Sequence, residues 1–251
     1  MIRRPPRSTL DRSSAASDVY KRQRMDQLIG QILDALRHNN LDQNTLIVYM
    51  SDHGEQAGEH DMWRKQTFYE HSVKVPTILS WPGRLPEGNR LRQVVSSLDL
   101  NTTLLDALDA PALPNSRGRS LLPLLEPTRS GQGVAWENVA FSEFCTDDSR
   151  KHRMIRQGEW KLNYYHGQPV QLFNLAEDPD ELNDLAGHPD HTGVQQELID
   201  RVLDGWDPDR IAEAIRHKRA DYDIIADWAR NTGPVDQYRW QLLPEMDYLN
   251  K

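Results

Sequence analysis

The sequence predicts an α/β fold in which part of a doubly wound sheet is followed by a small antiparallel sheet and C-terminal helices. A helical repeat of apolar residues leads directly into the apolar run Thr45–Met50, which is typical of a strand buried on both faces. The stretch Glu126–Gly133 is rich in Pro, Gly and Ser and therefore marks a linker. Beyond it, short runs separated by turn residues at hairpin spacing predict the antiparallel sheet.

The elements before the linker begin with a helix whose apolar residues recur at helical spacing: Leu28, Ile29, Ile32, Leu33 and Leu36. Asp26 is its expected N-cap, and Asn39–Asn40 its expected end. Further strands are predicted at Val75–Leu79 and Gln93–Ser96. The next helix follows Asp99, with one apolar face made of Leu100, Leu104, Leu105 and Leu108. A turn and a short apolar helix are predicted at Gly118–Leu125.

After the linker, four runs predict the strands of the antiparallel sheet: Val139–Phe144, Arg153–Arg156, Trp160–Tyr165 and Val170–Phe173. Thr192 and Gln195 have the spacing of a capping box at the start of a helix. Asp207-Pro208 predicts the start of a last helix, because proline is favoured at the first helical position. Its expected apolar face is Ile211, Ile215, Tyr222, Ile225 and Ala229, and an aromatic-rich tail ends the chain.

Composition excludes several classes of protein. The 251 residues carry a formal charge of −8, which disfavours non-specific binding to nucleic acid. No stretch approaches the roughly 20 apolar residues of a membrane span. A single cysteine, Cys145, rules out a disulfide framework within the chain. These observations predict a soluble protein and leave the compartment, cytoplasmic or periplasmic, undecided.

The first 23 residues differ from the rest. They hold six basic and two acidic residues, hence +4, whereas the remainder holds −12 (−8 minus +4). Their sequence resembles translated sequencing-adaptor read-through, so residues 1–23 are expected to be non-native and disordered, with an upstream part of the natural protein missing. The alternative is a targeting peptide, because Arg-rich and Ser-rich segments are typical of transit peptides.

Chemically useful side chains gather where the strand Thr45–Met50 ends. Asp52 and His53 follow it side by side, and a carboxylate with an imidazole suits a divalent cation. Lys65 follows thirteen positions after Asp52 (65 − 52) and offers a positive charge to an oxyanion ester. The alternative for each residue taken alone is structural: Asp52 caps the next turn, His53 is a surface histidine and Lys65 is a solvated lysine.

Taken together, these residues resemble a known family. Its motifs occur here in order: Ser51-Asp-His-Gly-Glu55, Gly58-Glu-His60, Trp63-Arg-Lys65, Val75-Pro76, Trp81-Pro-Gly83, Ser97-Leu-Asp99, Gly118-Arg-Ser-Leu121, Trp160-Lys-Leu162 and Asp178–Leu185. The stretch from Met25 to Trp206 resembles the C-terminal half of type I sulfatases of the alkaline phosphatase superfamily, and among them choline-sulfatase-type enzymes. The doubly wound sheet would then be alkaline-phosphatase-like. The resemblance implies a catalytic portion at residues 24–127, a C-terminal subdomain at 134–206, and a helix with an aromatic-rich tail at 207–251.

The resemblance also implies roles. Asp52 and His53 would bind the metal, Ca²⁺ in the first place and Mg²⁺ or Mn²⁺ as alternatives, and Lys65 would bind the sulfate and the leaving oxygen. His60 is a candidate for the substrate pocket. The substrate would be a small-molecule or carbohydrate sulfate ester, and a homo-oligomer through the C-terminal tail is conceivable.

The nucleophile of the family is a formylglycine made from a cysteine in a Cys-x-Pro/Ala-Ser-Arg motif. Cys145 lies in Phe-Cys-Thr-Asp-Asp and does not match it. The formylglycine is therefore expected in the missing N-terminal half, and the chain as written is expected to be inactive. Two alternatives stay open: a phosphonate monoester or phosphodiester hydrolase of the same superfamily, and an interaction module without chemistry.

Overall fold

The computed structural model describes residues 9–126, 135–147 and 150–233. For residues 9–18 and Asp147 it describes the backbone alone. The predicted linker falls largely, and the aromatic-rich tail almost entirely, outside these residues. Contacts divide the chain into two units. The first comprises Met1–Asp52, Val75–Arg92 and Ser97–Ala135, and the second comprises His53–Lys74, Gln93–Ser96 and Trp136–Lys251.

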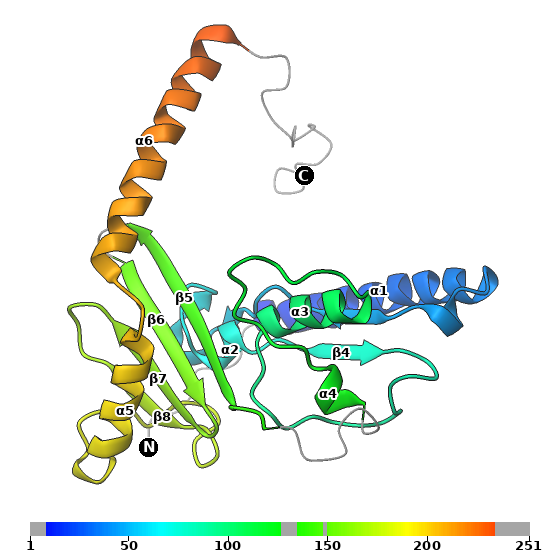
Figure 1. Ribbon diagram of the computed structural model, residues 1–251, viewed down its shortest axis with the longest axis horizontal. Coiled ribbons are helices and arrows are strands. Elements are labelled where there is room, and N and C mark those ends of the chain that lie inside the picture. The colour runs from blue at the N-terminus through cyan, green and yellow to red at the C-terminus, as the bar shows by residue number, and fades with distance from the viewer. Residues whose placement is uncertain (1–8, 127–134, 148–149, 234–251) are drawn as a thin grey trace. The chain divides into compact units, whose positions relative to one another are not determined.

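The first unit opens with a long helix, α1, at Thr9–His38 (Figure 1). It ends as predicted, because Asn40 adopts the left-handed conformation (φ 55°) that commonly ends a helix. Its start differs from the prediction: Asp26 lies inside the helix, and residues 9–23, expected to be disordered, are helical. The physical reason is that these residues include Ala, Leu, Arg, Lys and Gln and no Gly or Pro, so nothing in them interrupts a helix.

A two-stranded antiparallel ribbon follows the 3₁₀ turn Asp42–Asn44. Strand β1, Ile47–Met50, pairs with β4, Thr77–Ser80, so both strands were placed correctly by the sequence. Among the described residues β1 has no other partner strand, and its side chains are part-exposed rather than buried on both faces. The apolar run therefore predicted more burial of β1 than the structure shows, because the described segments around β1 cover this strand only in part.

A short loop docks onto helix α3, Ser97–Ala107, in the same unit. The buried Asp99 accepts a hydrogen bond from the Arg119 amide (2.8 Å). A Cβ at position 118 would lie 2.2 Å from the carbonyl oxygen of Leu98, so only glycine permits this approach. The predicted short helix is α4, Leu122–Leu125. The motif Gly118–Leu121 thus serves to pack this loop against α3.

The second unit is built on a four-stranded antiparallel sheet whose strands follow the chain order. The strands are β5 (Val139–Asp147), β6 (Arg150–Gln157), β7 (Trp160–Tyr165) and β8 (Gln171–Asn174). All four were predicted, although β5 and β6 are longer. Helix α5, Thr192–Leu203, packs on one face of the sheet around a buried core made of Ile155, Leu162, Leu172, Leu198 and Val202.

Two local predictions in this unit are wrong. Gln93–Ser96 is not a strand, because its backbone bonds to side chains instead: the Val94 amide donates to Asn138 Oδ1 (3.1 Å) and its carbonyl accepts from Trp136 Nε1 (2.8 Å). The capping box is not formed. The Gln195 side chain accepts from the Gly187 amide instead of reaching back to the helix start.

Helix α6, Pro208–Thr232, begins where the sequence predicted. The Asp207 side chain accepts hydrogen bonds from the amides of Asp209 and Arg210, both at 3.0 Å, which is an N-cap. The predicted apolar face is only partly covered in the described residues. Ala212 is buried, whereas Tyr222 and Ile225 are more than half exposed. Among the described helices, none combines the length and the apolar character that crossing a bilayer requires.

Candidate functional site

The segment His53–Lys74 carries most of the predicted site and belongs to the second unit. Its elements are the paired short strands β2 (Gln56–Ala57) and β3 (Trp63–Arg64), the 3₁₀ turn Glu59–Asp61, and the one-turn helix α2 (Glu70–Val73). In the sequence this segment falls within residues 24–127, the expected catalytic portion. In the structure it contacts the antiparallel sheet, so its environment is set by residues far along the chain.

The structure brings His53 and Lys65 together. His53 Nδ1 lies 2.8 Å from the carbonyl oxygen of Gly54, and a carbonyl can only accept, so Nδ1 carries the hydrogen. The lone pair is then on Nε2, and Lys65 Nζ contacts that atom. The His53 imidazole can therefore accept a hydrogen bond from the Lys65 ammonium group within this loop.

The turn after His53 requires glycine. The Gly54 amide donates to the carbonyl oxygen of Ser72 at 2.8 Å. A Cβ at position 54 would lie 2.0 Å from the carbonyl oxygen of His71, a distance that no side chain tolerates. The glycine thus lets α2 approach the backbone next to His53 and hold it in place.

Asp52 directly precedes His53 and belongs to the first unit. Its side chain is exposed, with Ser51 Oγ 3.5 Å from Asp52 Oδ1. The donor types of the two neighbours are those of a divalent-cation site, a carboxylate and an imidazole whose Nδ1 is bonded to a carbonyl. Lys65 would have to give up its contact with Nε2 for that atom to become a ligand. Within the described residues, no three His, Cys, Asp or Glu side chains converge on one metal position. Asp52 and His53 as metal ligands therefore remain a prediction from the sequence.

His60, the predicted pocket residue, lies in a backbone of unusual conformation. Gly58, His60, Asp61 and Arg64 all have positive φ, and a non-glycine residue with positive φ is uncommon. The His60 ring stacks on Tyr69, with ring centroids 3.8 Å apart and planes inclined by 9°. His60 therefore packs face to face against Tyr69.

A cavity of about 390 Å³ lies in the second unit, beside the stretch that follows Lys65. Its lining comes from that stretch and from the sheet with its β7–β8 turn: Met62, Gln66, Thr67, Phe68, Tyr69, Phe144, His152, Tyr165, Gln168, Pro169 and Gln171. Its volume falls within the range of about 300–1,000 Å³ that is typical of small-molecule sites. His60, the residue predicted for a substrate pocket, is not part of this lining.

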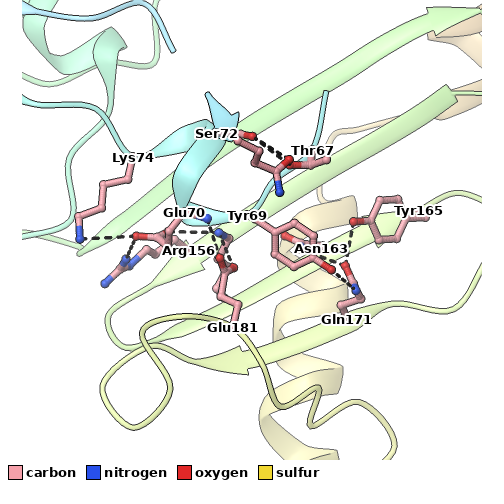
Figure 2. Close-up of polar contacts among 12 residues, drawn as sticks. Thr67, Tyr69, Glu70, Ser72, Lys74, Arg156, Asn163, Tyr165, Gln171 and Glu181 are labelled. Atoms are coloured by element: carbon pink, nitrogen blue, oxygen red, sulfur yellow. Dashed lines mark hydrogen bonds and ion pairs between the residues drawn. The ribbon is translucent and has the colours of Figure 1, made fainter. Parts of the chain in front are cut away.

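A buried ionic cluster joins helix α2 to the sheet (Figure 2). Lys161 Nζ, which is fully buried, lies 2.7 Å from Glu181 Oε1 and 3.1 Å from Glu70 Oε1. Arg156 contacts the other Glu70 oxygen at 3.0 Å, and the second Glu181 oxygen accepts the Glu70 amide at 2.6 Å. Two carboxylates are thus matched by two cations, and the cluster holds α2 and therefore the turn at Gly54.

Sequence reasoning missed this cluster. The alternation along β7 puts Lys161 and Asn163 on the face opposite the core, which is usually solvated. Here that face is covered by the segment carrying Glu70 and Tyr69, which lie about ninety residues earlier in the chain. In the sequence, Lys161 belongs to the ordinary alternation Trp160-Lys-Leu162, which does not reveal that the lysine is buried.

Cys145 does not have the environment of a nucleophile. It lies on β5, and burial together with the neighbouring Glu143 carboxylate raises the pKa of its thiol to about 11. Because the thiolate is the reactive form, this side chain is a neutral, weakly reactive thiol at neutral pH.

Two family models match the chain. The C-terminal domain of N-sulphoglucosamine sulphohydrolase matches residues 58–206, and the sulfatase model matches residues 4–110. The first match includes Lys65, the cavity lining and the ionic cluster. The second includes Asp52 and His53, and it starts inside the segment 1–23 that was expected to be non-native.

Individual relatives are sulfatases. The chain is 38% identical to arylsulfatase K of Gallus gallus over 172 residues, covering 64% of this chain and 31% of that protein. It is 31% identical to choline-sulfatase of Rhizobium meliloti (strain 1021) over 227 residues, covering 88% of this chain and 42% of that protein. The chain therefore spans less than half the length of each of these two relatives.

Solved structures with the same fold include one of a protein in complex with its substrate D-glucosamine-2-N,6-O-disulfate. It has a TM-score of 0.62 and 26% identity, and the match covers 73% of this chain and 40% of that one. The phosphonate monoester hydrolase of Agrobacterium radiobacter has a TM-score of 0.65 and 29% identity, and covers 71% of this chain and 38% of that one.

Proposed function

Because this chain belongs to the type I sulfatase family, we propose that it contributes the metal-binding and sulfate-binding groups of a sulfuric ester hydrolase. The observation that supports this most is the contact of Lys65 Nζ with His53 Nε2 in a loop whose backbone is held by the Gly54 amide and Ser72. The proposed substrate is a small-molecule or carbohydrate sulfate monoester, as in the related protein whose substrate is a glucosamine disulfate.

A metal cofactor is general in this family. We propose that Asp52 and His53 supply two of its ligands in this chain, with Ca²⁺ as the leading candidate because carboxylate oxygens suit a hard cation. A bound divalent cation would stabilise negative charge on the sulfate oxygens. His53 is prepared for this role, since the bond from Nδ1 to the Gly54 carbonyl keeps Nε2 as an acceptor.

Lys65 would act on the ester itself. Its ammonium group carries a positive charge and up to three hydrogen-bond donors. Placed at the bridging oxygen of the sulfate, it would stabilise the negative charge that develops there as the S–O bond breaks. A fixed charge of this kind lowers the barrier because it needs no reorganisation during the reaction.

The residues present do not fit the formylglycine of the family. No cysteine of the sequence lies in a Cys-x-Pro/Ala-Ser-Arg motif, and Cys145 is a partly buried thiol on a strand. We therefore assign the chain no covalent step. Its proposed contribution is to bind the metal, to hold the sulfate and to assist the leaving oxygen.

A phosphonate monoester or phosphodiester hydrolase is the second candidate. It is supported by the structural likeness to the Agrobacterium radiobacter enzyme. Such substrates share with a sulfate monoester a singly charged tetrahedral centre, so Asp52, His53 and Lys65 would suit both. The match of residues 58–206 to a sulphohydrolase model favours the sulfate ester.

A chimera tests the proposed function. This chain would replace the matching segment of the Rhizobium meliloti choline-sulfatase. We expect the chimera to hydrolyse p-nitrophenyl sulfate and the 251-residue chain alone to show no turnover. A folded, metal-loaded chimera that cleaves p-nitrophenyl phenylphosphonate but no sulfate would favour the second candidate, and one that cleaves neither would leave only an interaction module.

A further inference from the structure

A fully buried amide side chain lies inside the loop that carries His53 and Lys65. Gln56 is the first residue of β2 and is 0% exposed, whereas its neighbour Ala57 is exposed. An amide taken out of water lowers stability unless its oxygen and nitrogen find hydrogen-bond partners. The partners of Gln56 therefore show which parts of the loop it holds.

Two hydroxyl groups meet at the side-chain oxygen of Gln56. Thr67 Oγ1 donates to Gln56 Oε1 at 2.8 Å, and Ser72 Oγ lies 3.4 Å from the same oxygen. The two hydroxyl oxygens are 3.0 Å apart (Figure 2). Gln56 Nε2 lies 3.4 Å from the carbonyl oxygen of Glu59, and since a carbonyl only accepts, this contact fixes the orientation of the amide. The side chains of Gln56, Thr67 and Ser72 thus form a polar triangle inside the loop.

The polar triangle brackets Lys65 on both sides along the chain. Thr67 follows Lys65 by two positions (67 − 65), and Arg64, which directly precedes Lys65, is the partner of Gln56 in the β2–β3 pairing. Arg64 has a φ of 79°, a conformation that costs energy in a residue with a side chain and persists only where its surroundings hold it. Gln56 therefore restrains the backbone directly before the lysine and, through Thr67, the backbone after it.

The polar triangle reaches His53 through Ser72. The Ser72 hydroxyl belongs to the triangle, and the Ser72 carbonyl oxygen accepts a hydrogen bond from the amide of Gly54, the residue after His53, at 2.8 Å. Ser72 itself is buried, with 2% of its surface exposed. One buried residue therefore connects the turn at His53 with the stretch that follows Lys65.

From these contacts we infer that Gln56 is a positioning residue of the site: through Thr67 and Ser72 it sets where the Lys65 ammonium group lies relative to His53. Its full burial keeps the Gln56 side chain away from a substrate, so it acts through the other residues. The consequence for catalysis rests on the proposed function, because it matters only if Lys65 acts on the ester. The placement of Lys65 beside His53 does not rest on it and can be measured without turnover.

Variants that keep the shape of a side chain but remove its hydrogen bonds test the placement. Thr67→Val removes one hydroxyl, Gln56→Met removes the amide from a chain of similar length, and Thr67→Ser keeps the hydroxyl. In the 251-residue chain, nuclear Overhauser contacts between the Lys65 side chain and the His53 ring should be lost in Thr67→Val and Gln56→Met and kept in Thr67→Ser. Val202→Ala, which trims the buried core beneath α5, should keep them.

Turnover by the chimera gives the second readout. Thr67→Val should lower kcat for p-nitrophenyl sulfate by about 10- to 100-fold at unchanged metal content, the size of loss expected when a catalytic group is misplaced. The same change in a Lys65→Ala background should have little further effect, because the lysine whose placement it alters is gone. Thr67→Ser should recover most of the lost rate.

Equal losses of kcat in the two backgrounds would make the polar triangle a structural support alone and overturn the inference. So would a His53–Lys65 contact that survives both Gln56→Met and Thr67→Val, or that is absent from the parent chain. Loss of the contact in these variants, together with a chimera that has no turnover, would contradict the proposed function and leave the positioning role standing. Sulfate hydrolysis that Thr67→Val leaves unchanged would give the reverse result.

Discussion

Replacing Lys65 by alanine in the chimera is expected to lower kcat for p-nitrophenyl sulfate by about 10²–10³, the usual effect of removing one group that stabilises transition-state charge. The loss should appear in kcat more than in KM, because the charge on the bridging oxygen develops only as the bond breaks. The metal content of the variant should be unchanged, since Lys65 is a cation and no ligand.

Lys74→Ala is the matched control for this variant. Lys74 lies in the same segment and is exposed, with Nζ 4.0 Å from Glu70 Oε2, an ion-pair distance that contributes little at a surface. We expect its kcat to stay within about twofold of the parent chimera. Equal losses in the two variants, or an unchanged rate in Lys65→Ala, would remove Lys65 from the catalytic machinery.

Replacing Lys161 by alanine should have the largest effect on stability. The change leaves the fully buried Glu181 carboxylate without its cation and deprives Glu70 of one of its two close cations. Breaking a buried ion pair by removing one partner typically lowers the free energy of unfolding by about 3–5 kcal/mol. Urea unfolding followed by far-ultraviolet circular dichroism would measure the loss.

Lys151→Ala provides the comparison on the neighbouring strand. Lys151 Nζ lies 3.0 Å from Asp209; the Lys151 side chain is 12% exposed and the Asp209 side chain 79%, so water screens the pair from the Asp209 side. Its removal should cost no more than about 1 kcal/mol. If Lys161→Ala proved as mild as Lys151→Ala, the cluster around Glu70 and Glu181 would not be what holds α2 against the sheet.

The sequence predicted most elements of the fold because their signals are local. The four strands of the antiparallel sheet are bounded by turn residues, and Asp207-Pro208 is a complete helix start in two residues. The failures share a cause. At Gln93–Ser96 and at Gln195, side chains or backbone groups found partners in other segments, which propensity and spacing do not reveal.

The residues of the candidate site fall into the same two groups, those with local sequence signals and those that depend on distant segments. Asp52, His53 and Lys65 lie within one short stretch, so their spacing and the family resemblance identified them. Tyr69, Gln171 and the Glu70–Lys161–Glu181 cluster depend on a segment that folds over the polar face of a distant sheet. A sequence pattern of alternating residues shows that such a face exists, and it does not show what covers it.

The ionic cluster also connects the antiparallel sheet to the loop that carries the candidate site residues. Helix α2 contributes Glu70 to the ionic cluster. The Ser72 carbonyl of the same helix accepts a hydrogen bond from the Gly54 amide and so holds the turn at Gly54. The same segment carries Lys65 and much of the cavity lining. The antiparallel sheet, which contains none of the predicted metal ligands, therefore contributes to the site by fixing the loop that presents His53 and Lys65.

Asp52 and His53 are proposed to bind a divalent metal, and paramagnetic broadening by Mn²⁺ tests this on the chain itself. In ¹⁵N-labelled protein, substoichiometric Mn²⁺ should broaden the amide signals of residues 51–54 first, and Asp52→Ala should abolish this local effect. Asp42→Ala, which changes a partly exposed acidic residue in the 3₁₀ turn before β1, should leave it unchanged. Broadening that persists in Asp52→Ala, or that centres on the acidic residues 55–61 instead, would contradict the metal site and the proposed function that depends on it.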